Sequence, residues 1–185
     1  VVGSLSAPLM RGLDPYSSSA SGNLVTDVMR EYTGATVALH NRGGLRADLP
    51  AGKVTRRDLF RILPFENHVV SMDLTGAQLE KLLRRSVEGQ GHSGLEVSGV
   101  TLHLLSGAER PRLGRVVVGG KALVATASYR VVTNSFLAAG GDDYATFTEG
   151  TGRQVNPVLL RDLLETAFGS EPVTPPMASR FVLSE

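Results

Sequence analysis

The residues best suited to chemistry form one run at positions 134–142. A strand predicted over residues 129–133 leads directly into Phe136, the glycine pair at 140–141 and Asp142. Glycines carry no side chain, so the backbone can approach a bound molecule closely. An aromatic ring and a carboxylate beside such a turn indicate a pocket for a flat ligand with a polar edge.

A second aromatic ring is found in the run Leu63-Pro64-Phe65-Glu66-Asn67. Pro64 restricts the backbone just before the ring and limits the freedom of the turn. Phe65 and Phe136 are predicted to face each other across a gap about as wide as the thickness of one aromatic ring, with Asp142 at its rim. The alternative is that Phe65 is a core residue, as most phenylalanines are.

A third polar cluster, Asn41-Arg42-Gly43-Gly44-Leu45-Arg46, follows a predicted strand over residues 36–39. Asn41 can both donate and accept hydrogen bonds, which suits the edge of a heterocycle. Arg46 offers a planar fork for a carboxylate or phosphate. The alternative is an ordinary turn with a solvated arginine.

Helices and strands must position these clusters. A helical stripe over residues 23–33 ends at Gly34, and Thr55 with Asp58 and Thr75 with Gln78 have the spacing of helix-capping pairs. We expect Asn156 to cap a last helix that has Pro157 in its first position. Residues 89–97 are expected to form a glycine-rich loop, and strands are predicted over 68–74, 101–105, 115–118 and 122–124.

Helices and strands mix without regular alternation, which favours an α+β fold in which helices pack on a mixed β-sheet. Residues 1–185 show no internal repeat and no long linker, so one domain is expected. The chain begins at Val1 with neither an initiator Met nor a signal peptide, which is typical of a mature product or an excised domain.

Composition excludes several kinds of function. A net charge of +1 gives no strong field for a nucleic acid polymer, and the absence of cysteine excludes disulfides and Cys-zinc sites. No apolar run approaches the length of about 18 residues that a membrane span needs. The four histidines, His40, His68, His92 and His103, have no metal-site spacing, and no P-loop or nucleophile elbow is present.

We therefore expect no catalytic residue, metal or cofactor in this chain. A stand-alone hydrolase that uses His40, Asp142 and Asp143 is the least favoured alternative, because adjacent acids after a Gly-Gly turn usually only hydrate the turn.

The order of the motifs resembles the C-terminal domain of the 5′-nucleotidase family, which includes UDP-sugar hydrolases and 2′,3′-cyclic-nucleotide phosphodiesterases. The resemblance spans about residues 20–150. Besides the three clusters, it rests on Gly22-Asn23-Leu24-Val25-Thr26-Asp27, Gly52-Lys53-Val54-Thr55 and Leu74-Thr75-Gly76.

The resemblance implies a substrate-binding domain that follows an N-terminal metallophosphoesterase domain of the same polypeptide. That domain would hold two divalent metal ions and hydrolyse a phosphate ester. The family also implies an extracellular, cell-wall or periplasmic location. By the same resemblance, Phe65 and Phe136 stack on the base, Asp142 holds the ribose hydroxyls, Asn41 bonds the base, and Arg46 lies near the ribose or phosphate.

The chain departs from the family pattern in two places. Family members often carry one or two arginines just before the first helix, where this chain has Tyr16-Ser17-Ser18-Ser19-Ala20-Ser21, with Arg11 somewhat earlier. Asp143 replaces the glycine that is usual after Asp142. The missing arginines favour the alternative of an interaction or dimerisation module, such as a homodimer, in which the nucleoside pocket is degenerate.

Overall fold

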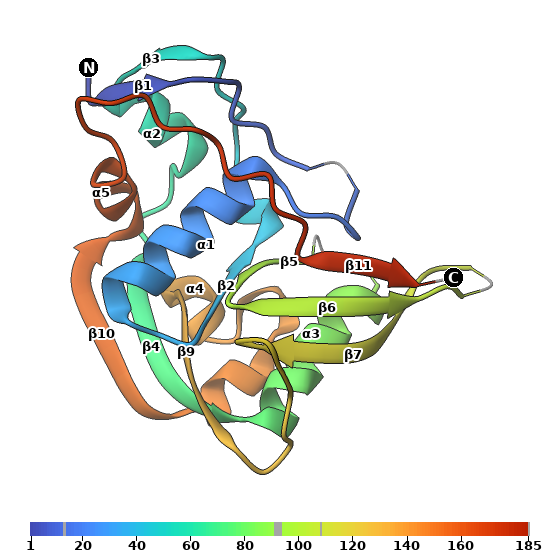
Figure 1. Ribbon diagram of the computed structural model, residues 1–185. Coiled ribbons are helices and arrows are strands. Elements are labelled where there is room, and N and C mark those ends of the chain that lie inside the picture. The colour runs from blue at the N-terminus through green and yellow to red at the C-terminus, as the bar shows by residue number, and fades with distance from the viewer. Residues whose placement is uncertain (13, 91–93, 108, 185) are drawn as a thin grey trace.

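A five-stranded mixed sheet forms the centre of the structure, a computed structural model that describes residues 1–12, 14–90, 94–107 and 109–184 (Figure 1). The strand order is β10-β4-β9-β2-β5. Strand β2 is parallel to β9, and the other neighbours are antiparallel. The strands are β2 (Val37–Asn41), β4 (His68–Thr75), β5 (Leu95–Ser98), β9 (Ser128–Asn134) and β10 (Thr151–Leu159).

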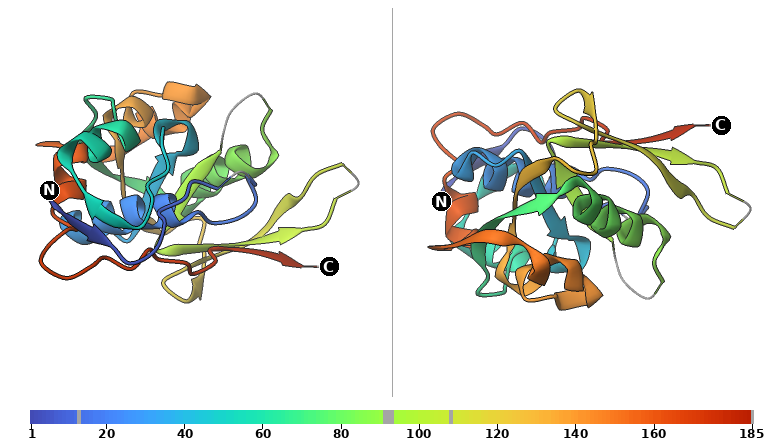
Figure 2. Two further views of the ribbon diagram at one scale, coloured as in Figure 1. Left: turned by 90° about the horizontal axis from the view of Figure 1, so that it is seen from above. Right: turned by 90° about the horizontal axis from the view of Figure 1, so that it is seen from below.

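A four-stranded sheet of order β11-β6-β7-β8 extends from one side of the central sheet and carries the C-terminus away from the N-terminus (Figure 2). Its strands are β6 (Val100–Leu105), β7 (Arg112–Val118), β8 (Lys121–Ala122) and β11 (Phe181–Ser184). Strands β1 (Gly3–Leu5) and β3 (Gly52–Val54) form a separate antiparallel pair.

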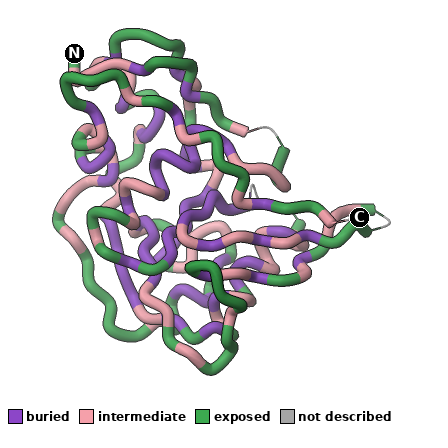
Figure 3. Tube along the Cα trace, viewed as in Figure 1, coloured by how far each residue is buried: buried purple, intermediate pink, exposed green. Residues whose placement is uncertain are grey.

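Helices cover both faces of the central sheet, because alternate strand residues point to opposite sides. Val37 and Leu39 pack in one apolar cluster with helix α3, whereas Ala38 packs in another with α1, α2 and α5. The buried residues of both clusters lie along the strands and helices in the centre of the molecule (Figure 3). The helices are α1 (Ala20–Thr33), α2 (Arg56–Ile62), α3 (Gly76–Glu88), α4 (Ser135–Ala138) and α5 (Leu160–Glu165).

The fold confirms the expected class of helices packed on a mixed sheet, although the strands form three sheets. Both predicted capping boxes are present, at Thr55 with Asp58 and at Thr75 with Gln78. Helix α1 starts three residues earlier than its apolar stripe, after Ser19, and ends at Gly34 in the left-handed conformation. None of the helices within the described ranges is long and apolar enough to cross a membrane.

The prediction that Asn156 and Pro157 begin the last helix is wrong. Both residues belong to β10, and α5 begins only after Leu159. Strand β10 lies at the edge of the sheet, where a proline without an N–H is tolerated. The Asn156 side chain accepts a hydrogen bond from the Val158 N–H at 3.0 Å, so it stabilises a local turn within an irregular strand.

Two further predictions need correction. Residues 95–97 belong to strand β5 and not to a loop, and the strand expected at 122–124 is limited to Lys121–Ala122. Strand β5 is four residues long and contains the buried Glu96, so neither its length nor its polarity pattern identifies it as a strand. The rest of the expected loop includes residues 91–93, which lie outside the described part of the chain.

Helix α1 approaches β5 at Gly22. A Cβ atom there would lie 2.1 Å from Glu96 Cδ. Glu96 cannot simply turn away, because it accepts a hydrogen bond from Ser19 Oγ at 2.6 Å and pairs with Arg42 at 3.2 Å. The glycine is therefore required by packing, even though glycine weakens a helix.

Gly22→Ala tests this contact. Helix propensity alone would stabilise the variant by about 1 kcal/mol. The clash with a buried, ion-paired carboxylate outweighs that gain, and we expect a net loss of about 2 kcal/mol or more in urea unfolding. Gly169→Ala is the control, because nothing lies within 4 Å of its added Cβ. An unchanged free energy of unfolding for Gly22→Ala would contradict the packing argument.

His40 lies in the interior of the sheet, on strand β2 between β9 and β5. Its ring is buried and contacts the backbone of the following turn, since a Cβ on Gly44 would lie 2.7 Å from His40 Cε1. Burial lowers the pKa of His40 from 6.5 to about 4. The folded protein therefore keeps this imidazole neutral over a pH range in which the unfolded chain binds a proton.

Stability should consequently fall as the pH decreases from 6.5 to 4, because only the unfolded state gains a proton on His40 in that range. The full effect amounts to about 3 kcal/mol. Urea unfolding across this range should show a shallower pH dependence for His40→Gln than for the wild type. Identical slopes for His40→Gln and the wild type would refute the assignment.

Candidate functional site

The three clusters meet at one end of the central sheet, where β2 and β9 finish and β4 begins. Strands β2 and β9 are parallel, so their carboxyl ends, Asn41 and Asn134, lie at the same end of the sheet. Strand β4 is antiparallel to β9 with Val69 opposite Asn134, so β4 starts at that end as well. The chain that precedes β4 carries Phe65. Segments nearly a hundred residues apart in sequence thus lie side by side.

Two asparagines and one aspartate form a chain of hydrogen bonds at this end of the sheet. Asn134 Nδ2 donates to Asn41 Oδ1 at 2.9 Å, and Asn41 Nδ2 donates to Asp142 Oδ2 at 3.1 Å. Asn134 Oδ1 in turn accepts from the Leu137 N–H at 2.9 Å and caps helix α4. The carboxylate is therefore oriented by Asn41 through its Oδ2 oxygen, while Asn41 and Asn134 are buried.

Asp142 lies in a turn with an uncommon backbone. Asp142 and Asp143 have φ values of 53° and 60°, in the left-handed region that non-glycine residues seldom adopt. They belong to the 3₁₀ segment Gly141–Asp143, which is followed by a second at Ala145–Glu149. Arg85 of α3 bonds Asp143 at 3.1 Å, and its guanidinium lies 5.9 Å from the centre of the Tyr144 ring. The turn is thus held from both sides, by Asn41 and by Arg85.

Both predicted stacking rings are exposed to solvent. The exposed fraction is 49% for Phe65 and 43% for Phe136, so the alternative that Phe65 is a core residue is wrong. The Phe136 ring lies directly over Gly141, where a Cβ would come within 2.6 Å of the ring. Gly141 is thus required for the position of the ring. The predicted width of the gap between the two rings remains a prediction.

The two ring-bearing segments are joined through Ser135. The His68 N–H donates to Ser135 Oγ at 3.1 Å, and Ser135 Oγ donates to Asn67 Oδ1 at 3.3 Å. Ser135 directly precedes Phe136, and Asn67 is two residues from Phe65. The two ring-bearing segments are therefore linked directly by hydrogen bonds.

Arg46 is exposed at the end of the glycine turn. Its N–H donates to Ile62 O at 2.9 Å, and Nη1 donates to Gly43 O at 3.2 Å. Arg11 lies beside the same turn, because its Nη1 donates to Leu45 O at 3.3 Å while Nε pairs with Asp48 at 3.2 Å. Two guanidinium groups therefore lie next to this turn.

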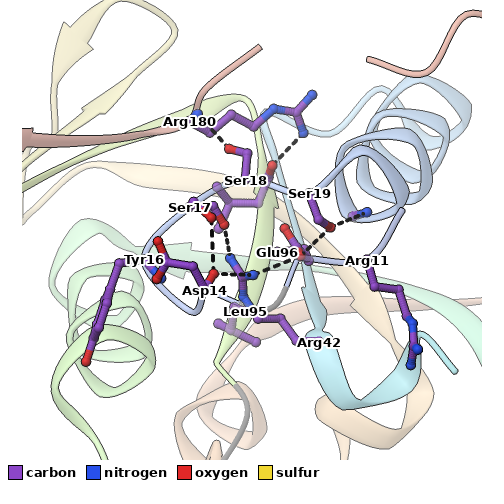
Figure 4. A network of polar contacts seen from close by, with 12 residues as sticks. Arg11, Asp14, Tyr16, Ser17, Ser18, Ser19, Arg42, Leu95, Glu96 and Arg180 are labelled. Carbon is purple, nitrogen blue, oxygen red and sulfur yellow. Dashed lines mark hydrogen bonds and ion pairs between the residues drawn. The ribbon is translucent and has the colours of Figure 1, made fainter. Parts of the chain in front are cut away.

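Sequence reasoning missed a buried ion pair behind the site. The Arg42 guanidinium lies 3.2 Å from Glu96 Oε1 and also donates to the carbonyls of Asp14 and Ser17 (Figure 4). Burial lowers the pKa of Arg42 and raises the pKa of Glu96, and the attraction between the two groups opposes both shifts. A single Glu in a short apolar strand gives no sequence signal for such a pair.

This ion pair connects the site to the segment where the family pattern calls for arginines. The Arg42 side chain is only 8% exposed and is directed toward residues 14–17 (Figure 4). Ser19, in the same segment, caps α1 and bonds Glu96. The turn after β2 thus places the Arg42 guanidinium against this segment. That guanidinium pairs with Glu96 and stabilises the fold.

Two residues of the alternative acid–base site lie in different surroundings. His40 is buried on β2, whereas the Asp143 side chain is exposed and paired with Arg85. Within the described ranges, no three His, Asp or Glu side chains group as ligands for a metal ion. His92 lies outside those ranges.

Comparisons with known proteins support the resemblance. A family model for the 5′-nucleotidase C-terminal domain matches residues 1–149. The Bacillus subtilis trifunctional nucleotide phosphoesterase is 34% identical over 143 residues, which cover 70% of this chain and 10% of that protein. A 5′-nucleotidase of Vibrio cholerae is 29% identical over 161 residues, which cover 84% of this chain and 28% of its own length.

The fold agrees with a solved structure as well. The 5′-nucleotidase precursor of Thermus thermophilus superposes with a TM-score of 0.85 at 29% identity, and the match covers 99% of this chain and 39% of that one. The chain therefore spans well under half the length of these relatives. We conclude that the chain belongs to the 5′-nucleotidase C-terminal domain family.

Proposed function

We propose that residues 1–185 form the nucleoside-recognising domain of a 5′-nucleotidase-like phosphate-ester hydrolase. One observation supports this most directly: the chain of hydrogen bonds from Asn134 through Asn41 to Asp142, next to two exposed phenylalanine rings. A flat base would lie between Phe65 and Phe136, and the free oxygen of Asp142 would accept hydrogen bonds from ribose hydroxyls.

The energies are consistent with a recognition role. Base–aromatic stacking stabilises a complex by about 1–3 kcal/mol per base. A carboxylate that is already oriented by Asn41 loses little freedom when it binds a diol, and charge-assisted hydrogen bonds are stronger than neutral ones. Together these contacts would hold a nucleoside with modest affinity, which suits positioning of a substrate for reaction elsewhere.

Hydrolysis would take place on an N-terminal metallophosphoesterase domain of the same polypeptide. We propose that this domain carries the two divalent metal ions, because the described residues of the present chain form no such site. Arg46 would lie toward the ribose or phosphate end of the substrate. In this proposal the present domain has no catalytic activity of its own, and the full protein works in an extracellular, cell-wall or periplasmic space.

The second candidate function is an interaction or dimerisation module. It is favoured by the absence of arginine from residues 16–21 and by the use of Arg42 in a buried ion pair. Under this alternative the aromatic edge would contact a protein or a second copy, and a nucleoside would not bind.

Removing either ring tests the proposal. Phe65→Leu and Phe136→Leu should each weaken adenosine binding to the chain by about 5- to 100-fold, because each removes one stacking partner. NMR titration with adenosine measures this affinity. Tyr32→Leu is the control, since Tyr32 is equally exposed (49%) but lies near the end of α1 and bonds Asn156 of β10. Absence of chemical-shift changes in the wild type at millimolar adenosine would instead support the interaction module.

Asp142→Asn tests the recognition of ribose. The amide replaces one acceptor oxygen with a donor, so binding of adenosine should weaken about 10-fold, whereas binding of 2′,3′-dideoxyadenosine should hardly change. Glu31→Gln is the control, because Glu31 is an exposed carboxylate near the end of α1, next to the Tyr32 control. Equal losses for the two nucleosides would rule out ribose recognition by Asp142.

A further inference from the structure

Helix α5 contacts the segment that carries Phe65 on both sides of the ring. The Leu160 N–H donates to Asn67 O at 2.8 Å, and Arg161 Nη1 donates to Leu63 O at 3.2 Å. These two carbonyls lie two residues after and two residues before Phe65. Consecutive residues of one helix therefore bracket the exposed ring.

The Leu63 carbonyl needs a partner from outside its own helix. Leu63 directly follows α2, and the last carbonyls of a helix have no partner within it. Pro64 forces Leu63 out of helical conformation, to φ −122° and ψ 74°. A guanidinium from α5 satisfies this carbonyl and fixes the point at which the chain leaves the helix.

Arg161 is itself held in place by a second contact. Its guanidinium carbon lies 4.5 Å from the centre of the Phe60 ring on α2, which is a cation–π geometry. The side chain thus lies between an aromatic face and a carbonyl oxygen, both of which come from the stretch that leads to Phe65.

The surroundings of Arg161 indicate a role other than core packing. Arg161, Phe60 and Glu165 line an open surface cavity of about 740 Å³, and this cavity contains none of the predicted nucleoside-binding residues. Apart from the two bonds from α5, the anchors of the Phe65 segment include the Arg46 N–H to Ile62 O and the Ser135 side chain to Asn67 and His68, which come from the site itself. Of the two α5 residues, Arg161 is the one that holds the segment through its side chain.

We infer that Arg161 is a positioning residue that fixes the Phe65 ring for stacking on the base of a nucleoside. The inference rests on the proposed nucleoside-binding function. It assigns a part in substrate recognition to a helix that contributes no residue to the predicted contacts with substrate.

Arg161→Met tests the inference, since it keeps an unbranched stem over Phe60 and removes the donor to Leu63 O. In the ligand-free chain, ¹⁵N relaxation should show lower backbone order parameters at Phe65 and Glu66. Adenosine should bind about fivefold more weakly, because a mobile ring stacks less effectively. Arg161→Lys should recover most of the affinity, because an ammonium can still donate to the carbonyl.

Arg56→Met is the matched control. Arg56 also joins α2 to α5, through Glu165 at 2.9 Å, but among the described residues its side chain bonds Glu165 and none of residues 63–67. It should leave both the order parameters and the affinity unchanged. If Arg161→Met and Arg56→Met behave alike, Arg161 has only a structural role and the inference fails.

The two readouts separate this inference from the proposed function. Wild-type order parameters in Arg161→Met would overturn the positioning role whether or not adenosine binds. Increased mobility with wild-type affinity would also overturn it. If adenosine does not bind to the wild type at all, the proposed function fails, and with it the part in recognition. Should Arg161→Met not fold, the same comparison is made with Arg161→Leu, which also removes the donor to Leu63 O. It should show the same rise in mobility and loss in affinity, and wild-type values of both would refute the inference.

Discussion

The parallel pairing of β2 with β9 is the constraint on which the site depends. The pairing places Val37 opposite Val131 and Ala38 opposite Val132, so both strands finish at the same end of the sheet. Because of this, the amides of Asn41 and Asn134 meet, and Asn41 reaches Asp142. If the two strands were antiparallel, Asn134 would lie at the opposite end and the hydrogen-bond chain could not form.

The turn that carries Asp142 is held in place by groups on two sides. Two consecutive aspartates in the left-handed region cost about 1 kcal/mol each, and they persist because neighbouring groups hold them. Asn41 orients Asp142 from the sheet, while Arg85 holds Asp143 from α3. A carboxylate that is fixed before binding loses little conformational entropy on binding, so this arrangement favours recognition over adaptability.

The buried Arg42–Glu96 pair contributes to order more than to net stability. Moving two charges out of water costs several kcal/mol, and the attraction between them offsets much of that cost. The pair joins the turn after β2, the strand β5 and the segment before α1, with Ser19 as a further partner. It therefore fixes three segments that come together behind the candidate site, and it accounts for the glycine at position 22.

The sequence alone determined the local features of this protein. Ser, Thr and Gly at helix ends predict where α1, α2 and α3 begin or end, since a cap satisfies backbone groups within a few residues. The residues proposed to bind the nucleoside were also identifiable, because Asn41, Phe65, Phe136 and Asp142 stand at strand or helix ends. Only the tertiary structure decided that these strand and helix ends meet at the same end of the central sheet. It also decided that residues 95–98 and 151–159 form strands and that Arg42 and Arg161 lie behind the turns. These features depend on partners distant in sequence, and such contacts leave no periodicity or capping signal in the local sequence.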